Sequence, residues 1–191
     1  MNPHFLFNAF NCLSSLIMLR RLDDAELTTL RLSSFLRKFL SADPTGRWDL
    51  SYEIDLIRTY LSIEQVRFPD RLTVQIDIPV GLTGALVPSF VLQPLVEDAV
   101  NRAVGLSLEP VTLNIWAVAS DGVLQLSVSD EGLPGANRAD PLDHEHLDES
   151  SADLAPLRNR LAAWDGGDGK LFRRGGPEGE TLTLCLPLVH R

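Results

Sequence analysis

The spacing of apolar residues changes near Pro69 and Asp70, and this change limits the folds that the chain can adopt. From residue 3 to about residue 42, apolar residues recur at helical spacing, and a further helix is predicted over 49–68. Over 72–78 they alternate with polar residues, as in a half-buried strand. The chain therefore combines a helical part with a part that contains a sheet.

The helical part, residues 1–68, is predicted to contain a hairpin. A reversal near Leu22-Asp23-Asp24 divides its first apolar stretch into two helices. Two helices cannot bury the whole of their apolar stripe, so pairing with a second copy into a four-helix bundle is favoured. We therefore expect a dimerisation region here and a homodimeric protein.

The remaining part, residues 69–191, is predicted to be a mixed sheet covered by helices. The acidic stretch 133–153 is expected to be a mobile loop. Helices packed on one face of a mixed, mostly antiparallel sheet make an α+β sandwich. Further helices are expected near 90–103 and 154–164, and further strands near 111–119, 123–129, 170–173 and 182–188, with a hairpin turn at 120–122.

Composition excludes several classes of protein. A net charge of −9 argues against nucleic-acid binding, which depends on clustered lysine and arginine. Cys12 and Cys185 lie far apart in the sequence, and two cysteines make no disulfide framework, which fits a reducing cytosol. The apolar stretch 5–19 is followed rather than preceded by basic residues, the wrong order for a secretion signal, and 82–96 is too short to span a bilayer.

The chain begins with a histidine in an unusual setting, the run Asn2-Pro3-His4-Phe5-Leu6-Phe7-Asn8. Proline suits the first turn of a helix, and Asn2 can cap the free amides beyond it, so His4 is expected on that first turn. A neutral imidazole there is a nucleophile that can attack a γ-phosphoryl group. A lone histidine is more often a satisfied surface or core residue, so the motif needs support from elsewhere.

Two further motifs give that support: the segment 60–72, which reads YLSIEQVRFPDRL, and the segment 92–100, which reads LQPLVEDAV. In this order, the three motifs resemble the LytS-type sensor histidine kinases, and the resemblance runs from Asn2 to about Pro187. It implies that His4 is the phosphoacceptor and that residues 69–191 form a GHKL-type ATP-binding domain. It also implies ATP and Mg²⁺ as cofactors and the receiver domain of a response regulator as partner.

The resembling kinases usually carry membrane-spanning or sensory domains before the histidine motif, and this chain starts inside that motif. We therefore expect the cytoplasmic portion of a membrane-anchored sensor kinase, with contact to the membrane only through a missing upstream region.

Glu97 and Asp98 are the first candidate site residues. They are adjacent on a predicted helix, so their side chains diverge by about 100° and cannot do the same job. The resemblance gives Glu97 a catalytic role at the phosphoryl centre and makes Asp98, normally Asn, the Mg²⁺ ligand, for which a carboxylate is well suited. Arg102 lies one turn later, where a cation can meet phosphate oxygens. Asn101-Arg102 replaces a Lys-His pair, so one basic group is missing.

A second group of candidates follows the strand predicted to end at residue 129. In the resembling family, an Asp-Asn-Gly-x-Gly element supplies the aspartate that accepts the adenine amino group. Asp130 and Gly132 match it, whereas Pro134 takes the place of the second glycine and Gly135 comes one residue late. Glycine permits the close backbone approach that this contact requires.

The remaining elements of the family pattern are altered. In the lid segment, Ser151 and Asp153 stand at the positions of two glycines and Pro156 at that of an asparagine. Near the end, Thr181 is kept for nucleotide binding, but Glu180 replaces the glycine before it.

These losses leave more than one hypothesis open. The leading one is a kinase core that phosphorylates His4 with ATP and transfers the phosphoryl group to a response-regulator aspartate. The alternative is a phosphotransfer or docking dimer with a degenerate ATP site, which is either non-catalytic or biased toward phosphatase activity.

Overall fold

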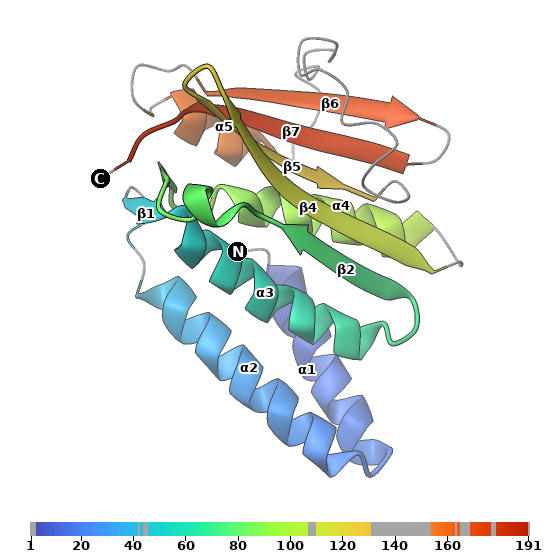
Figure 1. The fold of residues 1–191 in the computed structure, drawn as a ribbon. Coiled ribbons are helices and arrows are strands. Elements are labelled where there is room, and N and C mark those ends of the chain that lie inside the picture. The colour runs from blue at the N-terminus through green and yellow to red at the C-terminus, as the bar shows by residue number, and fades with distance from the viewer. Residues whose placement is uncertain are drawn as a thin grey trace.

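The described part of the chain consists of a helical hairpin, a layer of further helices and a five-stranded sheet (Figure 1). The computed structural model describes residues 3–41, 43, 46–106, 110–130, 154–162, 164, 169–176 and 179–190. Its helices are α1 (Pro3–Met18), α2 (Leu22–Leu40), α3 (Leu50–Arg67), α4 (Leu92–Leu106) and α5 (Ala155–Ala162), with a 3₁₀ turn at Val80–Leu82. Its strands are β1 (Arg47–Asp49), β2 (Leu72–Asp77), β3 (Leu86–Pro88), β4 (Val111–Ser120), β5 (Val123–Ser129), β6 (Lys170–Gly176) and β7 (Gly179–Pro187).

Helices α1 and α2 form the predicted hairpin, but the reversal comes slightly earlier than predicted. Arg20 adopts a left-handed backbone conformation with φ of 59°, and the Arg21 N–H donates to the Leu16 carbonyl at 2.9 Å. These features end α1 in a tight turn. Asp23 and Asp24 belong to the first turn of α2, where negative charge favours the helix dipole. Acidic residues that suggested a turn therefore begin a helix instead.

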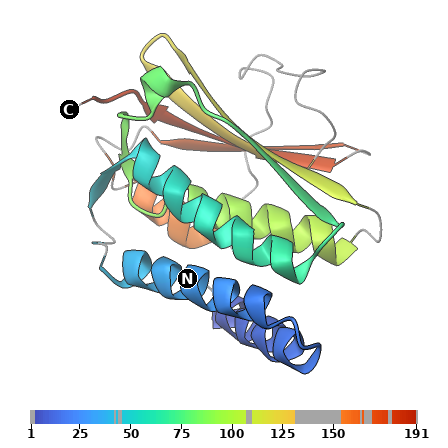
Figure 2. The same cartoon turned by 60° about the horizontal axis from the view of Figure 1, so that its bottom comes forward.

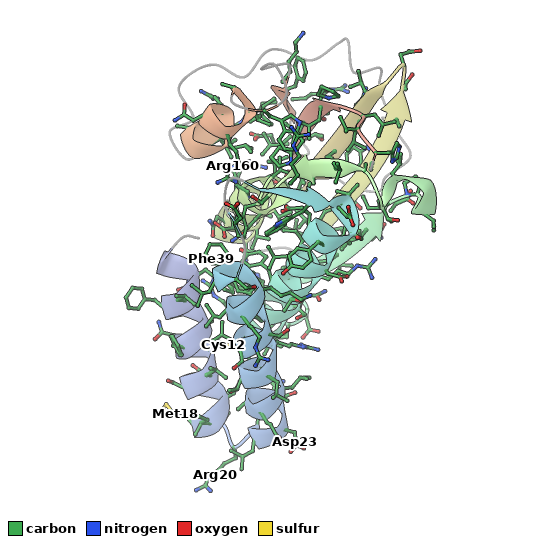
Figure 3. All side chains as sticks on the ribbon, turned by 90° about the vertical axis from the view of Figure 1, so that its left-hand side faces the viewer. Cys12, Met18, Arg20, Asp23, Phe39 and Arg160 are labelled. Carbon is green, nitrogen blue, oxygen red and sulfur yellow. The ribbon has the colours of Figure 1, made fainter. Side chains whose placement is uncertain are left out.

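The molecule is layered, as Figure 2 shows: the hairpin packs on α3, and α3 and α4 together cover the sheet. Helix α3 contacts α1 and α2 on one side and α4 on the other, and it runs almost the length predicted for it. A single cluster of buried apolar side chains extends from Phe5 of α1 to Leu186 of β7. The tip of the hairpin, with Met18 and Arg20, lies far from the sheet (Figure 3). The domain boundary at residue 68 stays a prediction, because α3 packs against both parts.

The larger sheet has the strand order β2-β4-β5-β7-β6. Strand β2 is parallel to β4, and the other neighbours are antiparallel, so the predicted α+β class with a mixed sheet is confirmed. Between β4 and β5, Asp121 and Gly122 have φ of 51° and 77°, which is typical of a tight hairpin turn. The acidic stretch 133–153 lies outside the described residues.

A two-stranded ribbon of β1 and β3 was not predicted. The strands are antiparallel, with Arg47 opposite Pro88 and Asp49 opposite Leu86. The Leu50 N–H donates to the Ala85 carbonyl at 2.8 Å, so the ribbon continues into the start of α3. It brings the first turn of α3 beside the segment that leads into α4.

Within the described residues, none of the helices combines the length and the apolar character that crossing a bilayer requires.

Candidate functional site

Helix α4 carries predicted site residues on two different faces, and its start is held by a buried carboxylate. Glu53 of α3 accepts hydrogen bonds from the N–H groups of Phe90 and Leu92, at 2.5 and 3.0 Å. Its side chain is fully buried, and this burial raises its pKa to about 7, although the backbone hydrogen bonds oppose the rise. Glu53 therefore acts as a cap, supplied by another helix, for the free amides at the start of α4.

Arg160 of α5 also binds the segment that leads into α4. Its guanidinium donates to the carbonyl oxygens of Ser89 and Phe90, at 2.8 and 2.9 Å. Phe90 itself has φ of 58°, a left-handed conformation that a phenylalanine rarely adopts. The position of α4 is therefore determined jointly by α3 and α5. Sequence analysis missed both charged residues; the available signal for Glu53 was a carboxylate at helical spacing with the apolar residues Leu50 and Ile57.

On the face of α4 toward the sheet, Arg102 is the centre of a group of charges that we call the Arg102 cluster. Arg102 forms an ion pair with Asp98, one turn earlier on α4. Its Nε lies 3.2 Å from Oδ2 of Asp130 at the end of β5, and its Nη1 lies 2.7 Å from Oε1 of Glu180 on β7. Arg173 of β6 completes the cluster, with its Nε 3.0 Å from Glu180 Oε1 and its Nη2 3.9 Å from Asp98 Oδ2.

The acidic members of the cluster are held closely. Asp130 is only 8% exposed, and its other oxygen, Oδ1, accepts the backbone N–H of Glu180 at 2.5 Å. Burial raises the pKa of Glu180, while Arg102 and Arg173 oppose the rise. Beside them, the Thr181 hydroxyl donates to the Ser129 hydroxyl at 3.0 Å. The cluster thus joins α4 to the ends of three neighbouring strands.

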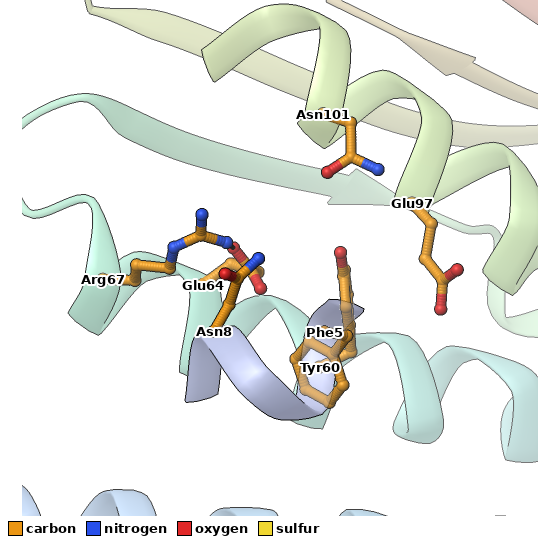
Figure 4. Close-up of a pocket in the computed structure, with 7 residues that line it drawn as sticks. All are labelled: Phe5, Asn8, Tyr60, Glu64, Arg67, Glu97 and Asn101. Atoms are coloured by element: carbon orange, nitrogen blue, oxygen red, sulfur yellow. Dashed lines mark hydrogen bonds and ion pairs between the residues drawn. The ribbon is translucent and has the colours of Figure 1, made fainter. Parts of the chain in front are cut away.

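The opposite face of α4 borders a small cavity (Figure 4). Glu97 points toward it and accepts a hydrogen bond from the Gln93 amide at 2.6 Å. Burial raises the pKa of Glu97, whereas the hydrogen bond from Gln93 acts to lower it. The residues that line the cavity come from α1 (Phe5 and Asn8), α3 (Tyr60, Glu64 and Arg67) and α4 (Glu97 and Asn101).

The cavity brings two carboxylates close to the histidine motif. Glu64 is buried, which raises its pKa, and Arg67 Nη1 donates to it at 3.2 Å. The Phe5 ring centre lies 4.9 Å from that of Tyr60. Since Phe5 follows His4 directly, Glu97 faces the end of α1 that carries the predicted phosphoacceptor.

Comparison with known proteins identifies the family of this chain. The model of the histidine kinase family matches residues 1–72. The sensor protein LytS of Staphylococcus saprophyticus is 39% identical over 191 residues, which cover 97% of this chain and 32% of that protein. The chain belongs to the LytS-type histidine kinases.

One further relative and one solved structure are also similar to this chain. The sensor histidine kinase BtsS of Escherichia coli K12 is 38% identical over 129 residues, which cover 68% of this chain and 23% of BtsS. The histidine kinase domain of a blue-light activated kinase from Erythrobacter litoralis EL346 shares the fold, with a TM-score of 0.52 and 13% identity over 97% of this chain and 93% of that one. The chain spans about a third of the length of LytS, and less of BtsS.

Among the site residues expected from the LytS-type pattern, the structure brings Asp98, Arg102 and Asp130 together. Thr181 lies one residue from Glu180 of the same cluster and bonds to Ser129. Glu97 lies apart from this group, on the cavity side of α4. The backbone of His4 belongs to the first turn of α1. Gly132 and Gly135 lie outside the described residues. Arg173 was not expected, because the pattern over β6 is too short to single it out.

Proposed function

We propose that this chain is the kinase core of a two-component sensor, in which His4 is phosphorylated by ATP and passes the phosphoryl group to an aspartate of a response-regulator receiver domain. One observation carries the proposal: α4 has the Arg102 cluster on one face and the cavity beside the His4 end of α1 on the other. The proposed nucleotide-binding residues and the phosphoacceptor then lie on different sides of one helix, so the triphosphate must extend past α4 for the γ-phosphoryl group to reach His4.

The residues present fit the proposed cofactors. Asp98 offers a hard carboxylate oxygen of the kind that Mg²⁺ prefers, and Asp130 offers an acceptor for the adenine amino group. Among the described residues, no group of three or more His, Cys, Asp or Glu side chains is arranged to hold a metal ion. In the proposal, one carboxylate together with phosphate oxygens holds Mg²⁺. When bound, ATP supplies the γ-phosphoryl group, and we assign Arg102 and Thr181 to the same binding site.

His4 performs the chemistry in this proposal. One imidazole nitrogen attacks the γ-phosphorus, so that an N–P bond forms while the P–O bond to the β-phosphate breaks and ADP leaves with the electron pair. Glu97 takes the proton that the phosphorylated imidazolium releases; a carboxylate whose pKa is raised by burial suits this task. The receiver aspartate then attacks the phosphorus, and the N–P bond breaks.

The hairpin supports the proposed homodimer. Large apolar side chains on it are exposed to a degree that is rare in a monomer. Pairing with a second hairpin would bury them. They are Phe7, Phe10, Ile17, Met18, Leu19, Leu22, Leu27, Leu30 and Leu40.

We further propose that the chain works as the cytoplasmic part of a membrane-anchored sensor, an assignment that depends on the family. The alternative of a non-catalytic or phosphatase-biased dimer is not favoured, because the proteins matched are kinases.

The test is autophosphorylation with ATP labelled at the γ-phosphate. His4→Gln should reduce incorporation of the label to background, while the matched control His190→Gln, an exposed histidine near the C-terminus, should leave it unchanged. The label should be stable to base and released by acid, as a phosphoramidate is. Label that survives in His4→Gln would contradict the assignment of the acceptor.

A further inference from the structure

Both carboxylate oxygens of Asp130 already accept a hydrogen bond, and the side chain is only 8% exposed. Its Oδ1 accepts the backbone N–H of Glu180 at 2.5 Å, and its Oδ2 accepts Nε of Arg102 at 3.2 Å. The function proposed above gives Asp130 to the amino group of adenine. The carboxylate could accept further hydrogen bonds, but so little of it is accessible that a base reaches it only after one of the two present partners moves aside.

The partner that can leave is Arg102. The Glu180 N–H belongs to β7, whose backbone is paired on both sides: Glu180 lies opposite Gly175 of β6, and Thr181 lies opposite Ser129 of β5. Moving it would disrupt two strand pairings. Arg102 reaches Asp130 through a long side chain with several rotatable bonds, so it can move without changing the backbone.

Glu180 is the residue that keeps Arg102 over Asp130. Asp98 is on the same helix as Arg102 and can remain paired with it when the guanidinium swings away. Glu180 comes from another element and binds Nη1 of Arg102 at 2.7 Å, so this ion pair must break. Arg173 competes for the same Glu180 oxygen at 3.0 Å. Arg102 is only 19% exposed, so water screens these pairs less than it would on the surface.

We propose that Arg102 is an internal competitor of adenine for Asp130, and that Glu180 and Arg173 determine how firmly it competes. This inference rests on the proposed nucleotide binding at Asp130. Purine entry exchanges the Arg102–Asp130 contact for a base–Asp130 hydrogen bond and breaks the Arg102–Glu180 pair. The affinity of the site for a purine is therefore lowered by Glu180, which stands where the family pattern has glycine.

The test uses adenosine as the probe, because an uncharged nucleoside is not attracted or repelled by a general change in charge. Adenosine binding to the folded chain is measured by calorimetry for the wild type and for Glu180→Gln, which keeps the shape of the side chain. We expect about tenfold tighter binding to Glu180→Gln, the order expected for one charge-assisted hydrogen bond. The control Asp121→Asn, in the exposed turn between β4 and β5, should bind adenosine like the wild type.

Arg173→Met is a second variant, for which the expected change in adenosine affinity is in the opposite direction. It removes the rival for Glu180, so Arg102 should be held more firmly and adenosine should bind more weakly than to the wild type. Equal adenosine binding by wild type and Glu180→Gln, or tighter binding by Arg173→Met, overturns the inference. If the proteins nevertheless bind ATP with Mg²⁺, the proposed function is unaffected. If none of the variants binds ATP with Mg²⁺, the proposed nucleotide site fails and the inference fails with it.

Discussion

Charged side chains bind at two places along α4, and the kind of partner that they use differs between the two places. At the start of the helix, the Glu53 carboxylate is satisfied by backbone N–H groups, and Arg160 by backbone carbonyls. Further along, the Arg102 cluster is held mostly by one side chain pairing with another. Backbone partners belong to the fold and cannot be exchanged, whereas side-chain partners can be replaced by a ligand. The first place therefore positions the helix, and the second is suited to binding.

The largest effect is expected from Glu53→Ala. The change leaves the buried N–H groups of Phe90 and Leu92 without their acceptor, and each such loss costs about 1 to 3 kcal/mol. We expect the free energy of unfolding to fall by about 3 kcal/mol, measured by urea denaturation. The control is Asp55→Ala, at an exposed position two residues further on. An equally small change in both variants would mean that Glu53 does not anchor α4.

A smaller effect is expected when pH changes the charge of Glu53. Its pKa is raised by burial from 4.5 to about 7, so the folded state binds this proton more tightly than the unfolded state. Its contribution to stability is complete below pH 4.5 and is lost as pH rises through 7. Between pH 4.5 and 7, the free energy of unfolding should therefore fall by about 2.5 kcal/mol.

Denaturation at several pH values checks this expectation. The matched variant is Glu53→Gln, in which the group cannot titrate but its shape is kept. Its stability should fall less steeply with pH than that of the wild type, because Glu64 and Glu97, whose pKa values are also raised, still contribute. Parallel curves for the two proteins would show that Glu53 has an ordinary pKa.

The smallest effect is expected from Arg160→Met. The apolar stem is kept, but the carbonyls of Ser89 and Phe90 lose their donor. Water can replace part of this bonding because Arg160 is not fully buried, so we expect a loss of about 1 kcal/mol. Arg58→Met, at an exposed position of α3, serves as the comparison. A loss as large as that of Glu53→Ala would show that both charged residues anchor α4 equally.

Sequence patterns predicted the features that depend on neighbouring residues and missed those that depend on contacts between distant residues. The helices and the longer strands were predicted because apolar periodicity is local, and the β4–β5 turn because Asp121-Gly122 suits its left-handed backbone. The β1–β3 ribbon was missed because three residues carry too little pattern. The sequence motifs indicated Asp98 and Asp130, but nothing in them indicated Arg173, which reaches the cluster only through strand pairing.

The sequence by itself determined the family, the fold class, the extent of most helices and strands, and which residues carry charge next to each other on α4. Only the tertiary structure decided which of those charges meet. Glu97 and Asp98 are neighbours in the chain, yet the helical rotation of about 100° per residue directs one toward α1 and the other toward Arg173 of β6. Each has one partner a turn away on α4, Gln93 for Glu97 and Arg102 for Asp98, but the α1 and α3 residues around Glu97 and Arg173 near Asp98 come from distant parts of the sequence, which burial of the common core brings together.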